Sequence, residues 1–177
     1  MPLTPPIVAG LSSIFDRDLN TLRREVEAYP DERGLWRDVP GIGNTAGTLA
    51  LHLAGNLQHF FGAVLGGTGY VRNRDAEFAR RDVARSELLQ EIEGARAAVK
   101  LGLAKLSDER LAGEYPETVA GVRFTTIGYL MHLVSHFAYH LGQIDCHRRV
   151  VTGNHASVGA VRPADLSPPQ PAGTLTR

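Results

Sequence analysis

The amino-acid sequence predicts an all-α protein, a four-helix bundle followed by a proline-rich C-terminal tail. Four segments repeat apolar residues at three- and four-residue spacing, and no segment keeps the strict alternation of a strand. Four amphipathic helices hide their apolar faces best by packing together. Residues 1–152 are therefore expected to form one bundle domain, and residues 153–177 an extended or disordered tail with little to bury.

The first half of the chain contains two of these segments. One apolar face runs through residues 5–29, and Pro30 ends the first predicted helix. A second helix is predicted to begin at Asn44 or Thr45, either of which can cap it, and to run to about Leu65. The glycine pair that follows breaks this helix.

The other two segments lie in the second half. A third helix is predicted over residues 83–106 and a fourth over residues 125–151. The polar stretch 68–82 is expected to be a loop with a short turn of structure. Residues 107–123, which contain proline and glycine, are expected to be a simple connection.

Composition excludes several classes of function. The 177 residues suit one domain, and 43% of them are hydrophobic, as is ordinary for a globular protein. The 19 basic and 19 acidic residues cancel and form no basic stripe, so nucleic acid is not an expected partner. No apolar run is long enough to span a membrane, and the first residues do not resemble a secretory signal.

Three residues are assigned structural roles or exposed positions at this point. Cys146 is the single cysteine and cannot form an internal disulfide, so a reducing, cytoplasmic location is expected. It is expected to act as a small apolar filler. His147 and His155 lack partners at useful spacing and are expected to be exposed.

The remaining histidines indicate a metal site. His132, His136 and His140 follow one another at four-residue spacing on the fourth predicted helix, while His52 and His59 lie near one face of the second. Two imidazoles at this spacing can hold one ion, and a facing helix can supply a third. Spacing alone leaves open which adjacent pair of the fourth helix is used. Imidazole suits zinc, nickel, iron and copper alike, so the ligand type does not select the metal.

Two stretches of the sequence resemble a known family. HLAGNLQHFFGAVLGGTGYVRNRDAEF and the later HLVSHFAYHLGQI are similar to the DinB-like (DinB/YfiT) superfamily, and closest to a branch of small bacterial proteins. The matched features cover most of residues 1–152. The resemblance implies up-down-down-up connectivity, a frequent homodimer, and a divalent metal held by His52, His136 and His140. That metal is commonly zinc or nickel, with iron and manganese as the other candidates.

Four further residues are candidates for contact with the metal ligands or a substrate. Asn56, one turn after His52, could orient a metal-bound water or a substrate, or could cap a backbone group. Gln143 could hydrogen-bond a loop or a ligand-bearing helix. His59 and His132 are the nearest candidates for a general base, and either could instead support the ligands or close the coordination sphere.

The charged run after the glycine pair has two interpretations. Arg72 and Arg74 could form an anion-binding rim over the metal. Alternatively, they pair with Asp75 and Glu77 and stabilise their own loop, which is the interpretation we favour. No acidic residue is clearly placed as a general base, and this weakens the case for a metal hydrolase.

Three functions are therefore considered. Some members of the family that the sequence resembles are S-transferases that use bacillithiol, mycothiol or glutathione. The leading hypothesis is therefore a metal-dependent transferase with a small thiol and an electrophile as partners. The second is a metal-dependent hydrolase that uses bound hydroxide. The third is a non-catalytic metal-binding bundle with a role in stress response.

Overall fold

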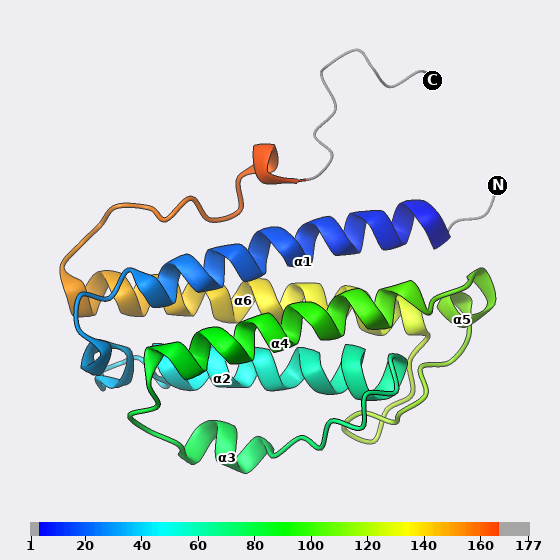
Figure 1. The fold of residues 1–177 in the computed structure, drawn as a ribbon, viewed down its shortest axis with the longest axis horizontal. Coiled ribbons are helices and arrows are strands. Elements are labelled where there is room, and N and C mark those ends of the chain that lie inside the picture. Colours follow the sequence, from blue (N-terminus) through cyan, green and yellow to red (C-terminus); the bar gives the residue numbers. More distant parts are fainter. Residues whose placement is uncertain (1–3, 167–177) are drawn as a thin grey trace.

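A computed structural model describes residues 4–166, and all regular secondary structure within them is helical. Four long helices lie side by side: α1 (Thr4–Glu27), α2 (Ala46–Leu57), α4 (Arg85–Ala104) and α6 (Thr126–Thr152) (Figure 1). In the same residues, strand-like pairing is limited to two isolated bridges in the loop before α6. The prediction of an all-α fold is confirmed.

The four long helices run in two opposite directions, with the first and last of them parallel and the middle two parallel. In Figure 1, α1 and α6 run from right to left, whereas α2 and α4 run from left to right. α1 packs against α4 and α6, and α2 packs against the same two helices. α2 continues without a break into η2 (Gln58–Leu65), an eight-residue π-helix. Because α2 lies beside α6, side chains on these two helices can meet.

The ends of the long helices agree with the predicted caps within a few residues. The Thr45 side chain accepts a hydrogen bond from the backbone N–H of Thr48 at the start of α2. Thr125 does the same at the start of α6, and Gly153 ends that helix with a φ of 67°. These are the residue types that satisfy the free backbone groups of helix ends.

Short helices lie outside the four long ones: η1 (Glu32–Trp36), α3 (Arg74–Ala79), α5 (Asp108–Ala112) and η3 (Pro163–Asp165). Of these, α3 falls within residues 68–82, where a short turn of structure was expected. The prediction that residues 107–123 form a simple connection missed α5. Each of these helices is six residues or fewer, too short for an apolar stripe to repeat. The first three begin instead at a capping side chain, namely Asp31, Asn73 and Ser107.

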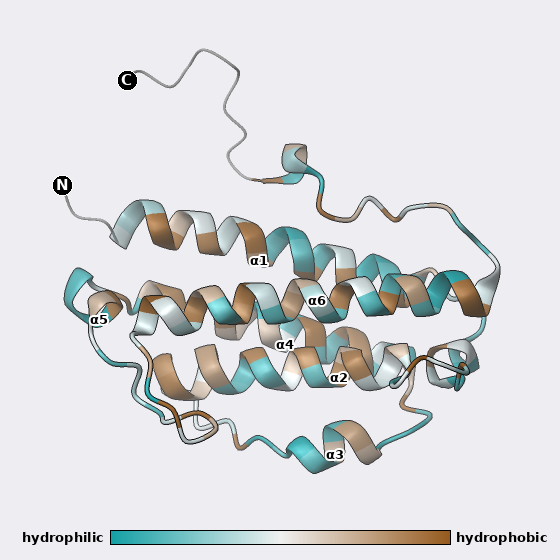
Figure 2. Cartoon of the chain, turned by 180° about the vertical axis from the view of Figure 1, so that it is seen from behind, coloured by the Kyte–Doolittle hydropathy of each residue, from teal (hydrophilic) through white to brown (hydrophobic). Residues whose placement is uncertain are grey.

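The apolar faces of the long helices meet in one core. Hydrophobic and hydrophilic residues alternate along each of them, as the amphipathic pattern requires (Figure 2). At the centre the ring of Phe15 meets Phe61 and Phe137 edge-on, with ring centroids 5.1 and 6.2 Å away. These three rings come from α1, η2 and α6, so they fix three segments distant in sequence against one another.

Glycines allow η2 to lie against α4. A Cβ added at Gly102 would lie 2.5 Å from the carbonyl oxygen of Phe61, and one added at Gly62 would lie 3.0 Å from the Cβ of Ala98. Backbone and side chains therefore approach here more closely than an alanine would allow. This contact holds one side of the α2–η2 unit, while the other side of α2 faces α6.

A buried arginine joins α1, α6 and the start of the tail. The side chain of Arg148 is 1% exposed and pairs with Glu25 of α1 and with Asp145, the latter at 2.7 Å. Its guanidinium also donates to the carbonyl oxygens of Asn154 and Ala156, each at 3.0 Å. The charge of a fully buried arginine is thus matched by carboxylates and its N–H groups by carbonyls.

Two expectations for the end of α6 are wrong. His147 is fully buried: its Nδ1 lies 2.7 Å from the Tyr29 hydroxyl and its Nε2 lies 2.8 Å from the Arg37 carbonyl oxygen. The end of α1 and the loop after η1 cover this face, and sequence spacing cannot reveal that. Cys146 is exposed and does not fill the core. His155 is exposed, as predicted.

Residues 153–166 of the predicted tail are extended apart from η3, whereas residues 167–177 lie outside the described residues. Arg24 on α1 donates to the carbonyl oxygens of Val158 and Gly159, at 2.8 and 3.3 Å. Between residues 4 and 166, no helix combines the length and hydropathy needed to cross a membrane.

Candidate metal centre

Three histidines meet between α2 and α6. His52 lies on α2, and His136 and His140 lie one turn apart on α6. One nitrogen of each ring lies within 4.8 Å of the corresponding nitrogens of the other two. His52 is buried, and the other two are half-buried. The structure therefore brings together the three histidines that the resemblance implied, and of the two pairs on α6 it is the second that faces α2.

The geometry of the cluster fits one small divalent ion. The Nε2 atoms of His52 and His136 are 3.2 Å apart. Two nitrogens held about 2.0–2.1 Å from one tetrahedral ion lie roughly 3.3 Å apart. The ring of His140 is perpendicular to that of His52 and nearly so to that of His136, with interplanar angles of 90° and 81°. One nitrogen of each ring lies within 4.8 Å of the others, so the three rings can share one ion.

The electrostatics of the cluster favour the neutral forms of His136 and His140. Burial, followed by the neighbouring imidazoles of His140 and His52, lowers the pKa of His136 to about 4. Burial also lowers the pKa of His140, against the opposing effect of its hydrogen bond to Gln143. Because only a neutral imidazole binds a metal, these rings are ready to act as ligands near pH 7.

The Nδ1 atoms of the three rings have different surroundings. The Nδ1 of His140 lies 2.7 Å from the side-chain oxygen of Gln143, and that of His52 lies 3.0 Å from Oε2 of Glu77. The Nδ1 of His136 is buried and has no hydrogen-bond partner within the described residues. Gln143 therefore contacts a histidine of the cluster on α6, in line with one of the two roles considered for it.

Glu77 lies next to the cluster on α3. Its side chain is 7% exposed, and Arg72 binds it with two hydrogen bonds, Nε to Oε1 at 2.7 Å and Nη2 to Oε2 at 2.8 Å. Burial by itself would raise the pKa of Glu77, but the hydrogen bonds from Arg72 and His52 keep it below its usual value. The salt bridge of Glu77 with Arg72 was expected from the sequence, whereas its contact with His52 was not.

Two other candidates do not join the cluster. Arg74 is exposed, and its guanidinium lies 4.8 Å from the centre of the Phe78 ring, which in turn lies 4.9 Å from the ring of His52. Asn56 is buried one turn after His52. Among residues 4–166, no hydrogen bond joins its side chain to the three histidines.

His59 and His132 are also outside the cluster. The Nε2 of His59 lies 2.9 Å from Oε2 of Glu117. His132 is exposed, and its ring stacks on Tyr129 with a centroid distance of 5.7 Å. In the part of the chain that the structure describes, the cluster therefore has three members, and an ion there would keep at least one position for water or a substrate.

Solvent can approach the cluster from the α6 side. His136 and His140 are half-buried there, and Tyr139 beside them is 65% exposed. The opposite side is closed, because Glu77 and Phe78 of α3 lie against His52. A small molecule would therefore enter along the surface of α6.

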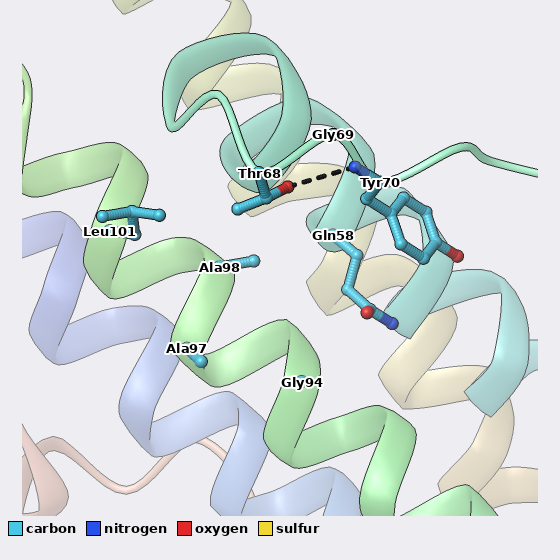
Figure 3. A pocket seen from close by; sticks show the side chains of 8 residues that line it. All are labelled: Gln58, Thr68, Gly69, Tyr70, Gly94, Ala97, Ala98 and Leu101. Atoms are coloured by element: carbon cyan, nitrogen blue, oxygen red, sulfur yellow. Dashed lines mark hydrogen bonds between the residues drawn. The ribbon is translucent and has the colours of Figure 1, made fainter.

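A separate cavity lies between η2 and α4 (Figure 3). It has a volume of about 380 Å³ and is lined by Gln58, Thr68, Gly69, Tyr70, Gly94, Ala97, Ala98 and Leu101. The Gln58 amide donates to Glu91 at 2.7 Å. None of the lining residues is a histidine, a cysteine or a carboxylate, so this cavity does not offer a second metal site.

Comparison with known proteins identifies the family. A family model described as the DinB superfamily matches residues 14–144, well over half of the chain. The chain belongs to the DinB superfamily, and the matched range contains all three clustered histidines. Comparisons with curated proteins and with solved structures found no match.

Proposed function

We propose that this DinB-superfamily protein binds a divalent metal ion, zinc or nickel, through His52, His136 and His140. The support is the convergence of three imidazoles from two helices at a spacing that one ion can bridge. The directions of α1, α2, α4 and α6 also support the up-down-down-up bundle of the family.

We further propose that the site serves a thiol S-transferase. When bound, the metal supplies a Lewis acid that favours the thiolate form of a small thiol. The thiol sulfur would form a bond to an electrophilic carbon, the leaving group would depart with its electron pair, and the thiol proton would go to solvent. His136 and His140 are half-buried, so both reactants would approach the ion from the α6 side.

One observation favours this reaction over hydrolysis. Hydrolysis on a metal is commonly assisted by a carboxylate or histidine that can accept a proton from water. Glu77 is the carboxylate nearest to the cluster in the described residues, and both of its oxygens are bound by Arg72 and His52. Its oxygens are therefore not directed at the entrance, and thiol addition needs no such base.

The test is turnover of a model electrophile, 1-chloro-2,4-dinitrobenzene, with glutathione, bacillithiol and mycothiol in turn. We expect one thiol to support turnover in zinc- or nickel-loaded protein, and both a chelator and His140→Ala to abolish it. His155→Ala changes an exposed histidine outside the cluster and should have no effect. Equal rates after metal removal would contradict the proposal, and ester cleavage without thiol would indicate the hydrolase instead.

A further inference from the structure

We infer that Glu77 is a positioning residue that holds His52 in the one tautomer able to bind a metal, with Arg72 and Gly55 fixing Glu77 in place. The effect on metal affinity rests on the proposed metal binding, whereas the effect on the tautomer does not. The inference assigns a function to α3, a six-residue helix that supplies none of the three clustered histidines.

The contact between Glu77 and His52 determines which nitrogen carries the proton. An ionised carboxylate can only accept hydrogen bonds. Since Oε2 of Glu77 lies 3.0 Å from Nδ1 of His52, Nδ1 must hold the hydrogen. Nε2, which faces His136 at 3.2 Å, then keeps a free lone pair. A ligand histidine oriented by a carboxylate in this way is also a more basic donor.

Arg72 keeps the carboxylate in position. Its Nε and Nη2 bind the two oxygens of Glu77 in the paired geometry that favours a carboxylate. Nη2 also lies 3.3 Å from Nδ1 of His52. Both nitrogens are donors when Nδ1 is protonated, so we assign the Nη2 hydrogen to the shorter contact, at 2.8 Å, with Glu77.

Gly55 leaves the space that Glu77 occupies. A Cβ added at Gly55 on α2 would lie 2.3 Å from Oε1 of Glu77 and 2.9 Å from its Cδ. An alanine would therefore push the carboxylate away from His52. The glycine, the arginine and the glutamate come from three segments of the chain. Together they hold the carboxylate of Glu77 against Nδ1 of His52.

The other two histidines lack such a partner. His140 meets the neutral amide oxygen of Gln143, and Nδ1 of His136 meets no hydrogen-bonding group of the described residues. The ring of Phe78 also packs on His52, with a centroid distance of 4.9 Å. His52 is thus the most firmly held of the three, and we expect it to anchor the ion.

The experiment compares four variants with the wild-type protein. Glu77→Ala removes both acceptor oxygens of the carboxylate, and Glu77→Gln leaves one of them. Gly55→Ala displaces the carboxylate. Glu87→Gln, at an exposed carboxylate that also pairs with an arginine, is the matched control. The first readout is the ¹⁵N chemical shift of the His52 ring in metal-free protein, and the second is zinc affinity by competition with a coloured chelator. Circular dichroism confirms that each variant is folded.

We expect His52 of the wild-type and Glu87→Gln proteins to be protonated at Nδ1. In Glu77→Gln the two tautomers of His52 should mix. The glutamine amide has one oxygen that accepts and one NH2 group that donates, so it cannot replace both oxygens of Glu77 as acceptors for His52 and Arg72. Zinc affinity should fall by about 10- to 100-fold in the Glu77 variants, and in Gly55→Ala in the same direction.

Unchanged shifts and unchanged affinity in a folded Glu77→Gln protein would overturn the inference. If the wild-type protein itself binds neither zinc nor nickel, the proposed function fails. The ¹⁵N shifts of His52 would still decide the role of Glu77 in that case, so the two failures are distinguishable.

Discussion

Histidines in this chain have different roles because their two ring nitrogens meet different neighbours. Both nitrogens of His147 are taken by protein groups, the Tyr29 hydroxyl and the Arg37 carbonyl, so this ring can only be structural. His136 instead directs Nε2 at His52 and leaves Nδ1 without a partner among the described residues. Burial alone would not separate these roles, because each of the two rings is at least half-buried.

His147 should make the metal-free protein less stable in acid. Burial lowers its pKa, despite the hydrogen bond to Arg37, so below pH about 6.5 the unfolded chain binds more protons than the folded one. The contribution of His147 to stability is therefore complete above about pH 6.5 and is lost as the pH falls. His147→Gln should show a weaker pH dependence than wild type in urea unfolding with chelator present. Parallel curves for the two proteins would rule this out.

At the scale of elements, the C-terminal half of α6 is joined to α1 by charge. Arg148 faces Glu25 within the core, while its neighbour Arg149 is 33% exposed and pairs with the outer oxygen of Asp145. Two adjacent arginines therefore share Asp145 as a partner, but only Arg148 is buried and also pairs with Glu25. This makes them a natural pair for measuring what a buried ion pair contributes.

Removing the buried arginine should be far more damaging than removing the exposed one. Arg148→Met leaves Glu25 in the core without its guanidinium, and we expect a loss of about 3–5 kcal/mol in the free energy of unfolding. Arg149→Met should lose less than about 1 kcal/mol, as for other solvent-exposed pairs. Chemical denaturation measures the free energy of unfolding of both variants. Equal losses would mean that the buried ion pair of Arg148 stabilises the fold no more than the exposed pair of Arg149.

Two helical glycines should respond in opposite directions to an alanine, because one lies in the contact between η2 and α4 and the other does not. Gly102→Ala places a Cβ 2.5 Å from a backbone oxygen of η2 and should lower the free energy of unfolding by about 1–3 kcal/mol. Gly10→Ala in α1 meets nothing within 4 Å and should raise it by roughly 0.5–1 kcal/mol. Thermal unfolding of both variants would test this, and a stabilised Gly102→Ala would show that the two segments can separate.

The elements that could be predicted are those with long repeating patterns. The four long helices follow from apolar spacing, and the threonine caps of α2 and α6 from local capping chemistry. Both depend on neighbours in sequence. The π-helix η2 was not predicted, and it packs closely on α4, which lies far along the chain. A short turn of structure was expected within residues 68–82, where α3 lies, but the contact of Glu77 on α3 with His52 was not, because it joins segments far apart in the sequence.

The candidate site was predictable to a similar extent. Spacing indicated that histidines on two helices could meet, and the family motif selected His136 and His140 over the earlier pair. The role of Glu77 could not be predicted, because it depends on a helix too short to show periodicity and on the space left by Gly55. Its position in the Arg-x-Arg-Asp-x-Glu run was the available signal, but a salt-bridged loop was the favoured interpretation of that run.

At the scale of the whole molecule, an ion at the cluster would join α2 to α6. We expect saturating zinc, at about 100 times its dissociation constant, to add roughly 2.7 kcal/mol to the free energy of unfolding. For a chain of this length that is a rise in melting temperature of about 5–10 °C. Calorimetry with zinc and with chelator measures the change.

The matched control for this prediction is His136→Ala, which removes one ligand from the half-buried side. Its melting temperature should be the same with zinc and with chelator. A wild-type protein that also melts at one temperature under both conditions would show that the helices hold together without help from an ion.

The position of Arg148 affects how the chain can be shortened for experiments. The family match ends at residue 144, yet the guanidinium of Arg148 depends on carbonyl oxygens of Asn154 and Ala156. A recombinant fragment trimmed at the last turn of α6 would strip acceptors from a group that water cannot reach. Fragments meant for crystallisation or spectroscopy should therefore extend past Gly159, whose carbonyl oxygen accepts a hydrogen bond from Arg24 of α1.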